Sequence, residues 1–600
     1  MAEQEAFLSR QSAVSGIFLD NLKTATPWIL KAVGVEYLLE QVEKGNRQNV
    51  LHIATHLSNL MKVSENVVVR QAAGSSLLSL ASVLTPERRN EIAVELSKSL
   101  ETGDADSSKY IPEYLGRFSL WLPPGELDEL VGQMEFLLSS PIAGVVSAAL
   151  RTVGSMLEYY AVYKQRFNED EPAVTARRNR LAGLLLRGLA SCRESVRQTT
   201  LHILGDGLFA SGALGFEDKE ALFVLMSKKI LFLMNESEER ELTFFYAAAT
   251  LSHIYRFILA HELEDGPFRF PQPPAAAFFP GTFDPFSLSH KGIVQAIRDL
   301  GFEVYLAIDE FSWSKKAQPS LVRRQIVSMS VADQFGVYLF PHDIPVNLAD
   351  PISLNRLRAV FAGRELYLAV GSDVVANASS YRAAPAEGSV QYLNHIVFRR
   401  SSDAEGREID PDLGCVKGEV LQLELPTHLE DISSTRIREN IDLGRDISNL
   451  VDPTVQDYIY RNSLYLREPQ YKQILRASDL EFSFAERPDR ALLEELSSAV
   501  GDGAPLPFRP ERGDSLMVLR LQGPRPRVLG FLALRTVTTA TLYDALGDFG
   551  LADYVRRRTA GRIALLTGLY TAKGCGAAYD VGQLLLTEAL SRAMVSDCGY

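Results

Sequence analysis

The sequence predicts a multi-domain protein in which an all-helical region is followed by a parallel-sheet α/β region and a smaller α/β region. Three patterns support this prediction. Apolar residues recur at helical spacing up to about residue 265, strand-like and helical segments alternate over 275–466, and strand-like runs dominate 478–600. A chain of 600 residues also exceeds what one hydrophobic core supports, so several domains are expected.

The composition is that of a globular protein in a reducing compartment. Apolar residues make up 46% of the chain and charged residues 23%, and the formal net charge of −13 argues against a nucleic-acid partner. The four cysteines are far apart, which predicts neither a disulfide framework nor a metal site. Because no uncharged apolar run reaches about 18 residues and no signal-peptide pattern begins the chain, we expect a cytoplasmic protein without membrane contact.

Residues 1–265 are expected to form one helix after another, as the leucine spacing over 181–189 indicates. Three helices with similar, small-residue-rich starts are expected at 69–73, 146–149 and 196–200. Units of roughly 40 residues built in this way resemble HEAT-type repeats. Since the spacings are irregular, a plain helical bundle is an equal alternative. The region contains no catalytic constellation, so we expect either a surface for a protein partner or a domain that only packs on its neighbour.

A proline-rich linker over 266–274 separates the helices from the parallel-sheet region, because four prolines in eight positions favour extended backbone. From 275 to 466, continuous apolar strands alternate with helices, which predicts a parallel sheet covered on both faces. Ligands of such sheets bind at the carboxyl ends of the strands. The strands are expected at 275–279, 304–308, 336–340, 366–370 and 420–423.

The most informative segment, Pro-Gly-Thr-Phe-Asp-Pro-Phe-Ser-Leu-Ser-His at 280–290, follows the first of these strands and leads into a helix. A glycine turn between a strand and a helix directs backbone N–H groups and a helix N-terminus at one spot, which suits an anion. We expect Gly281 to let the backbone approach a phosphate closely and Asp284 to fix the turn. His290 lies at the opening of that helix, where a protonated or donor imidazole can reach a phosphate.

A second segment, Ile-Ser-Ser-Thr-Arg-Ile-Arg at 432–438, also begins a helix. The hydroxyl and N–H groups of Ser433, Ser434 and Thr435 suit the β- and γ-phosphates of a triphosphate. Arg438 follows one turn later and can face the same anion with a guanidinium that suits phosphate. Simple N-capping of the helix is the alternative explanation of these hydroxyl groups.

Together, the segments 280–290 and 432–438 resemble the GTFDPxHxGH and ISSTxIR signatures of the nucleotidyltransferase superfamily. The resemblance implies a Rossmann-like domain over 275–466 that transfers a nucleotidyl group and releases pyrophosphate, with His290, Lys315 and Arg438 in catalysis. The nucleotide-binding residues that it implies are Gly281, Thr282, Phe283, Asp284, Ser287, His290, Ser433, Ser434, Thr435 and Arg438. Ser287 and Ser289 depart from the family pattern, so a nucleotide-sensing protein without turnover is an alternative.

The middle of this region resembles the nicotinate- and nicotinamide-mononucleotide adenylyltransferases of that superfamily. Gly371 and Asp373, followed by Tyr381, are similar to their GxD…W segment, which implies ribose contact by the carboxylate and ring stacking by the tyrosine. The acceptor-binding residues that the resemblance implies are Lys315, Arg324, Asp373, Tyr381 and Arg399. ATP is the implied substrate, with Mg²⁺ bridging its phosphates. Cytidylyl transfer, or another phosphorylated acceptor, remains open.

The last region is expected to contain strands at 480–484, 515–521, 528–534 and 562–566, and a helix at 581–594. This order resembles the acetyl-CoA-binding half of a GNAT acetyltransferase, and the loop after the last strand partly fits that family's pyrophosphate loop. The residues implied to contact CoA are Lys573, Gly574 and Gly576. An ordinary small α/β domain is the alternative. Because a GNAT fold needs one more strand, we expect the natural protein to continue beyond residue 600 and keep acetyl transfer as a further candidate activity.

Overall fold

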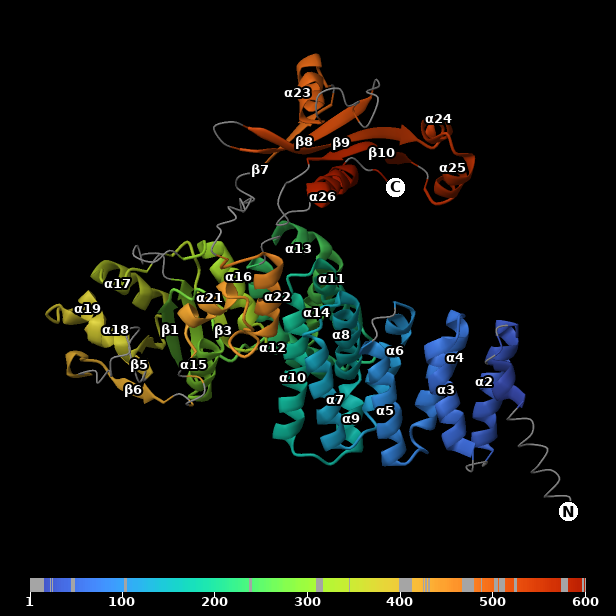
Figure 1. Ribbon diagram of the computed structural model, residues 1–600, viewed down its shortest axis with the longest axis horizontal. Coiled ribbons are helices and arrows are strands. Elements are labelled where there is room, and N and C mark those ends of the chain that lie inside the picture. Colours follow the sequence, from blue (N-terminus) through green and yellow to red (C-terminus); the bar gives the residue numbers. More distant parts are fainter. Residues whose placement is uncertain are drawn as a thin grey trace. The chain divides into compact units, whose positions relative to one another are not determined.

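The structure is a computed structural model of the 600-residue chain, and its helices and strands are shown in Figure 1. It describes residues 16–21, 23, 25–44, 49–101, 105–236, 240–308, 317–344, 346–398, 413–424, 426, 429, 432–466, 480–486, 488–500, 506, 513–522, 526–559, 561–572, 581–595 and 598. The chain divides into two compact units. The first comprises Met1–Ser237 and Tyr246–Leu466, and the second comprises Glu238–Phe245 and Arg467–Tyr600.

The first unit begins with helices that stand side by side from α2 to α12 (Figure 1). They are α2 (Trp28–Glu43), α3 (Val50–Val63), α4 (Val67–Leu80), α5 (Pro86–Glu101), α6 (Ala105–Ser119), α7 (Pro124–Leu137), α8 (Ala143–Glu158), α9 (Tyr160–Arg166), α10 (Glu171–Leu189), α11 (Glu194–His202) and α12 (Phe216–Asn235). A π-helix, η2 (Ile203–Phe209), follows α11, and α14 (Ala248–Glu264) completes the series. The intervening α13 (Arg240–Tyr246) belongs almost wholly to the second unit. The HEAT-type register of these helices remains a prediction.

Small residues let the central helix α8 pack closely on its neighbours. A Cβ atom added at Gly116 in α6 would lie 2.6 Å from the Thr152 carbonyl oxygen of α8. A Cβ atom added at Gly154 of α8 would collide with the Ile203 side chain of η2. Small residues thus permit close helix packing along α8, the helix that contains the expected small-residue-rich start at 146–149.

The proline-rich segment 266–274 is not helical, as expected. Aromatic side chains anchor it on the preceding helices. The Phe268 ring stacks on His261 of α14 with 3.8 Å between centroids and lies 4.4 Å from the Phe223 ring of α12. The segment is thus a docked connection in this structure.

A parallel sheet forms the second half of the first unit, and the expected strands are present. In the strand order β3-β2-β1-β4-β5-β6 every neighbouring pair is parallel. The strands are β1 (Ala275–Gly281), β2 (Glu303–Ile308), β3 (Val337–Leu339), β4 (Glu365–Gly371), β5 (Asn394–Phe398) and β6 (Val420–Leu423). The order reverses between β1 and β4, so the carboxyl ends of these two strands border the crevice where such sheets bind ligands.

Helices and short turns of helix connect these strands or, in the case of the last two helices of the region, follow β6. They are α15 (Leu288–Asp299), α16 (Ser320–Ser330), α17 (Pro351–Val360), α18 (Ser372–Asn377), α19 (Ser379–Arg382), η3 (Val390–Tyr392), η4 (Leu413–Cys415), α21 (Ser434–Asp442) and α22 (Pro453–Arg461). The apolar side chains of β1 and β4, among them Phe278 and Leu368, are buried with Leu354 and Leu357 of α17. This core holds the strand ends that carry the candidate site.

The second unit contains an antiparallel sheet in the order β10-β9-β8-β7. Its elements are β7 (Leu480–Ala485), α23 (Arg490–Val500), β8 (Asp514–Leu521), β9 (Arg527–Thr538), α24 (Leu542–Leu546), α25 (Phe549–Arg556), β10 (Arg562–Thr571) and α26 (Val581–Val595). Met517 and Leu532 pack against Leu585 of α26, whereas Leu516 and Phe531 pack with Leu496 of α23. The GNAT resemblance remains a prediction, because Lys573, Gly574 and Gly576 lie outside the described residues.

None of the helices that the structure describes is long and apolar enough to cross a lipid bilayer.

Candidate nucleotide-binding site

The turn after β1 is built around the ring of Phe283. This residue has a φ of +46°, which is unusual for a residue other than glycine, and its side chain is buried. The ring lies edge-on to Phe279 and to His290, at 5.3 Å between centroids in both cases. A Cβ atom at Gly281 would lie 2.6 Å from the Phe283 ring, so this turn requires a glycine there even without a ligand.

Asp284, which was expected to fix this turn, is hydrogen-bonded to two other segments of the chain. Its buried carboxylate accepts hydrogen bonds from the Tyr465 hydroxyl at 2.8 Å and from the Gln318 backbone N–H at 3.3 Å. Burial, and then the negative charge of Asp284, raise the pKa of Tyr465 well above its usual value. On the other side, Arg323 Nη1 donates to the Thr282 carbonyl oxygen at 2.7 Å. The turn is therefore held at the side chain of Asp284 and, through Arg323, at the backbone of Thr282.

Ser287 and His290 form a capping box at the start of α15. The Ser287 N–H donates to His290 Nδ1 at 3.0 Å, and the His290 N–H donates to Ser287 Oγ at 3.3 Å. Since Nδ1 accepts this backbone bond, the proton of a neutral imidazole lies on Nε2. Ser287 is 1% exposed, so its hydroxyl holds the helix start and the imidazole ring rather than lining the pocket wall, which corrects its expected role as a direct ligand.

The second expected segment, at the start of α21, lies against this turn. Ser434 Oγ donates to the Pro285 carbonyl oxygen at 2.9 Å, across 149 positions of sequence. Arg438 Nη1 donates to the Asp284 carbonyl oxygen at 2.5 Å, and its Nη2 donates to Thr435 Oγ1 at 3.2 Å. Ser433 caps the helix by accepting from the Arg436 N–H at 3.2 Å. The N-termini of α15 and α21 therefore meet at one place, with an imidazole and a guanidinium beside them.

A network of buried charges connects the start of α15 to the helical region. Lys291 Nζ lies 3.0 Å from Asp333 Oδ1 and 3.0 Å from Asp452 Oδ2. Asp452 Oδ1 lies 3.7 Å from Nη2 of Arg187, a residue of α10. Burial opposes the charged carboxylate, but the attraction of Lys291 and Arg187 prevails and lowers the pKa of Asp452 to about 2. Helix α15 is thus connected to α10 of the helical region through the carboxylate of Asp452.

Arg324, expected on the acceptor side, has partners in the helical region. Its guanidinium donates to both carboxylate oxygens of Glu236, at 2.7 and 2.8 Å, and to the Phe340 carbonyl oxygen at 3.1 Å. Both side chains of the ion pair are less than a tenth exposed. The structure therefore replaces the expected acceptor contact of Arg324 with a role in docking the helices, while its neighbour Arg323 supports the phosphate-binding turn.

Tyr381 also differs from its expected role. Its ring is buried in the core of the parallel-sheet region, and its hydroxyl lies 2.8 Å from His395 Nε2. Burial raises the pKa of Tyr381 and lowers that of His395, so both groups stay neutral. A ring that is enclosed in this way has no face for a ligand, and this corrects the stacking prediction.

Asp373 remains at the crevice, because it lies in the first turn of α18 just after β4. A Cβ atom at Gly371 would collide with the Asp373 carboxylate, which explains the glycine. Lys315 and Arg399 lie outside the described residues, so their expected roles stay predictions. In the part of the chain that the structure describes, no group of three or more His, Cys, Asp or Glu side chains is arranged to hold a metal ion.

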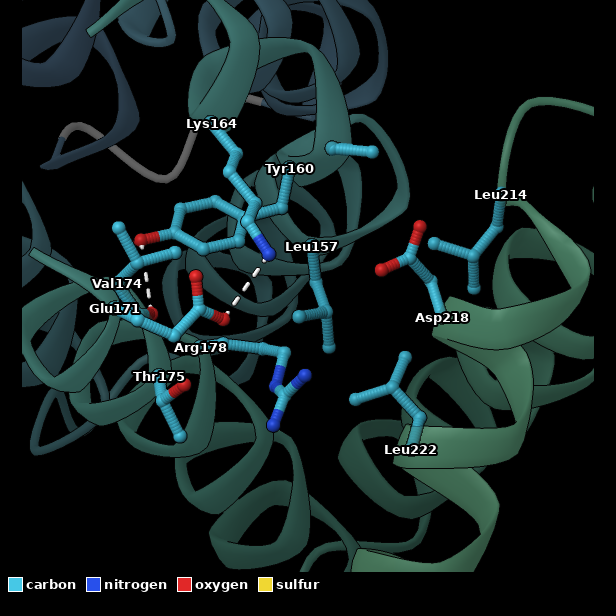
Figure 2. A pocket seen from close by; sticks show the side chains of 11 residues that line it. Leu157, Tyr160, Lys164, Glu171, Val174, Thr175, Arg178, Leu214, Asp218 and Leu222 are labelled. Atoms are coloured by element: carbon cyan, nitrogen blue, oxygen red, sulfur yellow. Dashed lines mark hydrogen bonds and ion pairs between the residues drawn. The ribbon is translucent and has the colours of Figure 1, made fainter. Parts of the chain in front are cut away.

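A separate small cavity lies within the helical region (Figure 2). Its volume of about 30 Å³ is room for about one water molecule. Figure 2 shows the Lys164–Glu171 ion pair, 3.0 Å long, and the hydrogen bond from the Tyr160 hydroxyl to the Val174 carbonyl oxygen, 3.2 Å long. Because it has room for about one water molecule, the cavity is not a candidate ligand site.

Part of the chain is similar in sequence to proteins described as probable nicotinate-nucleotide adenylyltransferases. The protein from Dehalococcoides mccartyi strain BAV1 is 25% identical over 200 residues, which is 31% of this chain and 95% of that protein. The one from Dictyoglomus turgidum is 24% identical over 203 residues, or 32% of this chain and 95% of that protein. No protein-family model matches the chain.

Among solved structures, the Plasmodium falciparum nicotinic acid mononucleotide adenylyltransferase complexed with APC covers 32% of this chain and 97% of its own, at 18% identity and a TM-score of 0.26. The same enzyme complexed with NaAD gives a TM-score of 0.27. The sequence comparisons establish a low-identity similarity to adenylyltransferases over about 200 residues, which is one third of the chain.

Proposed function

We propose that the parallel-sheet region, residues 275–466, transfers AMP from Mg–ATP to nicotinate or nicotinamide mononucleotide and releases pyrophosphate. The observation that carries this proposal is the contact between the turn at 280–290 and the start of α21, through Ser434 and Arg438. Two helix N-termini that converge beside a crevice of a parallel sheet suit a polyphosphate. The similarity to nicotinate-nucleotide adenylyltransferases supports the same reaction.

In this reaction a phosphate oxygen of the acceptor attacks the α-phosphorus of ATP, and the bond from that phosphorus to the bridging oxygen of the β-phosphate breaks. The electron pair leaves with pyrophosphate. No nucleophile is required from the protein, which has to align two polyanions and neutralise the developing charge. His290 would donate from Nε2 to an oxygen of the α-phosphate, because its Nδ1 accepts the Ser287 N–H.

Arg438 would face the β- and γ-phosphates. Its guanidinium is fixed by the Asp284 carbonyl oxygen and by Thr435, so little side-chain entropy is lost when the triphosphate binds. About one third of its side chain is exposed, which leaves a surface for a phosphate contact. Asp373, at the end of the neighbouring strand β4, would contact the acceptor ribose across the crevice.

The test is pyrophosphate release by the full chain, with ATP or CTP against nicotinate mononucleotide, nicotinamide mononucleotide and phosphopantetheine. We expect release with ATP and one of the two pyridine mononucleotides. His290→Ala and Arg438→Ala should each lower kcat by roughly tenfold or more, which is typical for loss of one preorganised charge contact. Arg436→Ala is the matched control, because Arg436 lies on the exposed side of the same helix.

Three results would count against the proposal. If calorimetry detects ATP binding but no acceptor leads to release of pyrophosphate from ATP, the domain senses a nucleotide without turnover. Preference for CTP would establish cytidylyl transfer. Unchanged rates in both variants, with normal activity of the wild type, would exclude His290 and Arg438 from the site.

A further inference from the structure

A groove with a volume of about 460 Å³ lies in the helical region, far larger than one water molecule requires. We call it the Trp121 groove, after the tryptophan in its wall. Ser79 of α4, Arg117 of α6 and Arg166 of α9 also line it, together with Tyr159. No residue of the proposed transferase site takes part, so the groove calls for a separate explanation.

Guanidinium groups are stacked on the aromatic rings of the Trp121 groove. The Cζ atom of Arg166 lies 3.5 Å from the centroid of Trp121, and that of Arg89 lies 5.5 Å from it. The Cζ atom of Arg117 lies 4.6 Å from the centroid of Tyr159. Stacking of this kind holds a guanidinium in a fixed orientation while its N–H groups at the edge stay available.

The two arginines on Trp121 have backbone carbonyls as partners. Arg166 Nη1 donates to the Leu120 carbonyl oxygen at 2.9 Å, and Arg89 Nη1 donates to the Trp121 carbonyl oxygen at 3.1 Å. In the described part of the chain, no carboxylate oxygen lies within the 4.0 Å of an ion pair with either. Arg117 has a loose pair, at 3.9 Å from Glu113. Burial lowers the pKa of Arg89, and burial followed by the charge of Arg89 lowers that of Arg166.

The chain has a net charge of −13, and several arginines of the helical region have carboxylate partners. Arg177, for example, pairs with Asp128 at 2.7 Å and with Glu169 at 2.7 Å. Like charges held near each other without a carboxylate gain free energy when an anion binds near them. The groove therefore has the electrostatics of an anion site.

We propose that the Trp121 groove binds an extended acidic segment of a partner protein. Its volume exceeds what a single inorganic anion fills, and three guanidiniums from separate helices line or adjoin it, so several carboxylates can be paired at once. A nucleotide fits less well, because Arg166 already covers the Trp121 ring on which a base would stack. Carboxylate side chains match the planar fork of arginine without needing that ring.

The experiment measures fluorescence anisotropy of a fluorescein-labelled hexaglutamate peptide with the full chain at low salt. We expect saturable binding that weakens as salt increases, and no binding of a labelled hexaglutamine peptide. Arg166→Gln and Ser79→Glu should each weaken hexaglutamate binding by about tenfold, the second by placing a carboxylate in the groove. Arg180→Gln is the matched control, because Arg180 is an exposed arginine that already pairs with Glu135 at 2.8 Å.

Either of two outcomes would overturn the proposal. The first is absence of hexaglutamate binding, or equal binding by all three variants, when their circular-dichroism melting curves match that of the wild type. The second is binding of inorganic phosphate that depends on Arg166 while hexaglutamate does not bind, which would identify a site for a small anion.

Discussion

Two clusters of basic residues in the first unit have opposite surroundings. At the junction between the helices and the parallel sheet, Arg187 and Lys291 share the buried carboxylate of Asp452. Arg193 pairs with Asp457 and Arg324 with Glu236 at the same junction. At the Trp121 groove, Arg89 and Arg166 lie on an aromatic ring and bond to carbonyl oxygens.

The comparison indicates that a carboxylate partner, more than burial, distinguishes a basic side chain that stabilises the fold from one that is available to bind a ligand. At the junction each cation has at least one carboxylate partner, so removing a partner weakens the compensation of that charge and costs stability. At the groove the carboxylate is missing from the described surroundings, so substitution of an arginine should cost binding and little stability. The predictions below test this division, from the largest expected effect to the smallest.

Asp452→Asn should cause the largest loss of stability. The substitution removes the carboxylate that Lys291 and Arg187 share. Because Lys291 keeps Asp333 and Arg187 keeps Glu135, the free energy of unfolding should fall by about 2–3 kcal/mol, less than for a charge with no partner left. Urea unfolding followed by circular dichroism measures this. Asp446→Asn, in the same loop but exposed, should have a much smaller effect. Equal losses in both variants would show that the junction charges do not stabilise the fold.

Acidification should weaken the same contact. The pKa of Asp452 is lowered from 3.8 to about 2, so its stabilisation is fully present above pH 3.8 and is lost as the pH falls through about 2. The lowered pKa corresponds to roughly 2 kcal/mol. The difference in unfolding free energy between wild type and Asp452→Asn should therefore narrow between pH 4 and pH 2. A constant difference over this range would contradict the role given to the carboxylate.

Arg193→Lys should have an intermediate effect. Arg193 donates from Nε and Nη2 to the two oxygens of Asp457, at 2.9 Å each, and a lysine keeps the charge but not this paired geometry. We expect a loss of about 1–2 kcal/mol in the free energy of unfolding, measured by urea. Arg461→Lys is the control, because Arg461 contacts the same carboxylate from an exposed position. A loss as large in the control would mean that the buried fork has no special importance.

Arg166→Gln should change stability least. The Arg166 guanidinium has a carbonyl partner and a like-charged neighbour, Arg89. Removal of this guanidinium should therefore alter the free energy of unfolding by no more than about 0.5 kcal/mol, in either direction. The same variant is the one expected to lose hexaglutamate binding. If Arg166→Gln lost as much stability as Asp452→Asn, the arginines of the groove would stabilise the fold in the same way as the charges of the junction, which would contradict this comparison.

Much of the fold was predictable because it depends on local patterns. Continuous apolar runs separated by helical spacing predicted five of the six parallel strands, all but β5, and the strand–turn–helix order at 280–290 predicted where α15 begins. The start of α21 was predictable from the hydroxyl residues Ser433 and Ser434, which cap it or contact the turn. These features need only neighbours along the chain.

The assignments that failed depend on partners that are distant in sequence. Arg323 and Arg324 are adjacent on α16, and about 100° of helical rotation separates their side chains. One reaches the Thr282 carbonyl oxygen and the other Glu236, and no local pattern distinguishes them. Tyr381 was expected to stack on a ligand, yet burial beside His395 gives its hydroxyl a partner inside the core.

The sequence alone determined which segments become strands and helices, where glycine is needed in the turn after β1, and which groups could meet a phosphate. Only the tertiary structure decided which charges are neutralised, because Asp452 joins Lys291 and Arg187 from three separate parts of the chain. Periodicity specifies the apolar face of a helix or strand, whereas the partner of a charged group depends on packing between elements far apart in sequence.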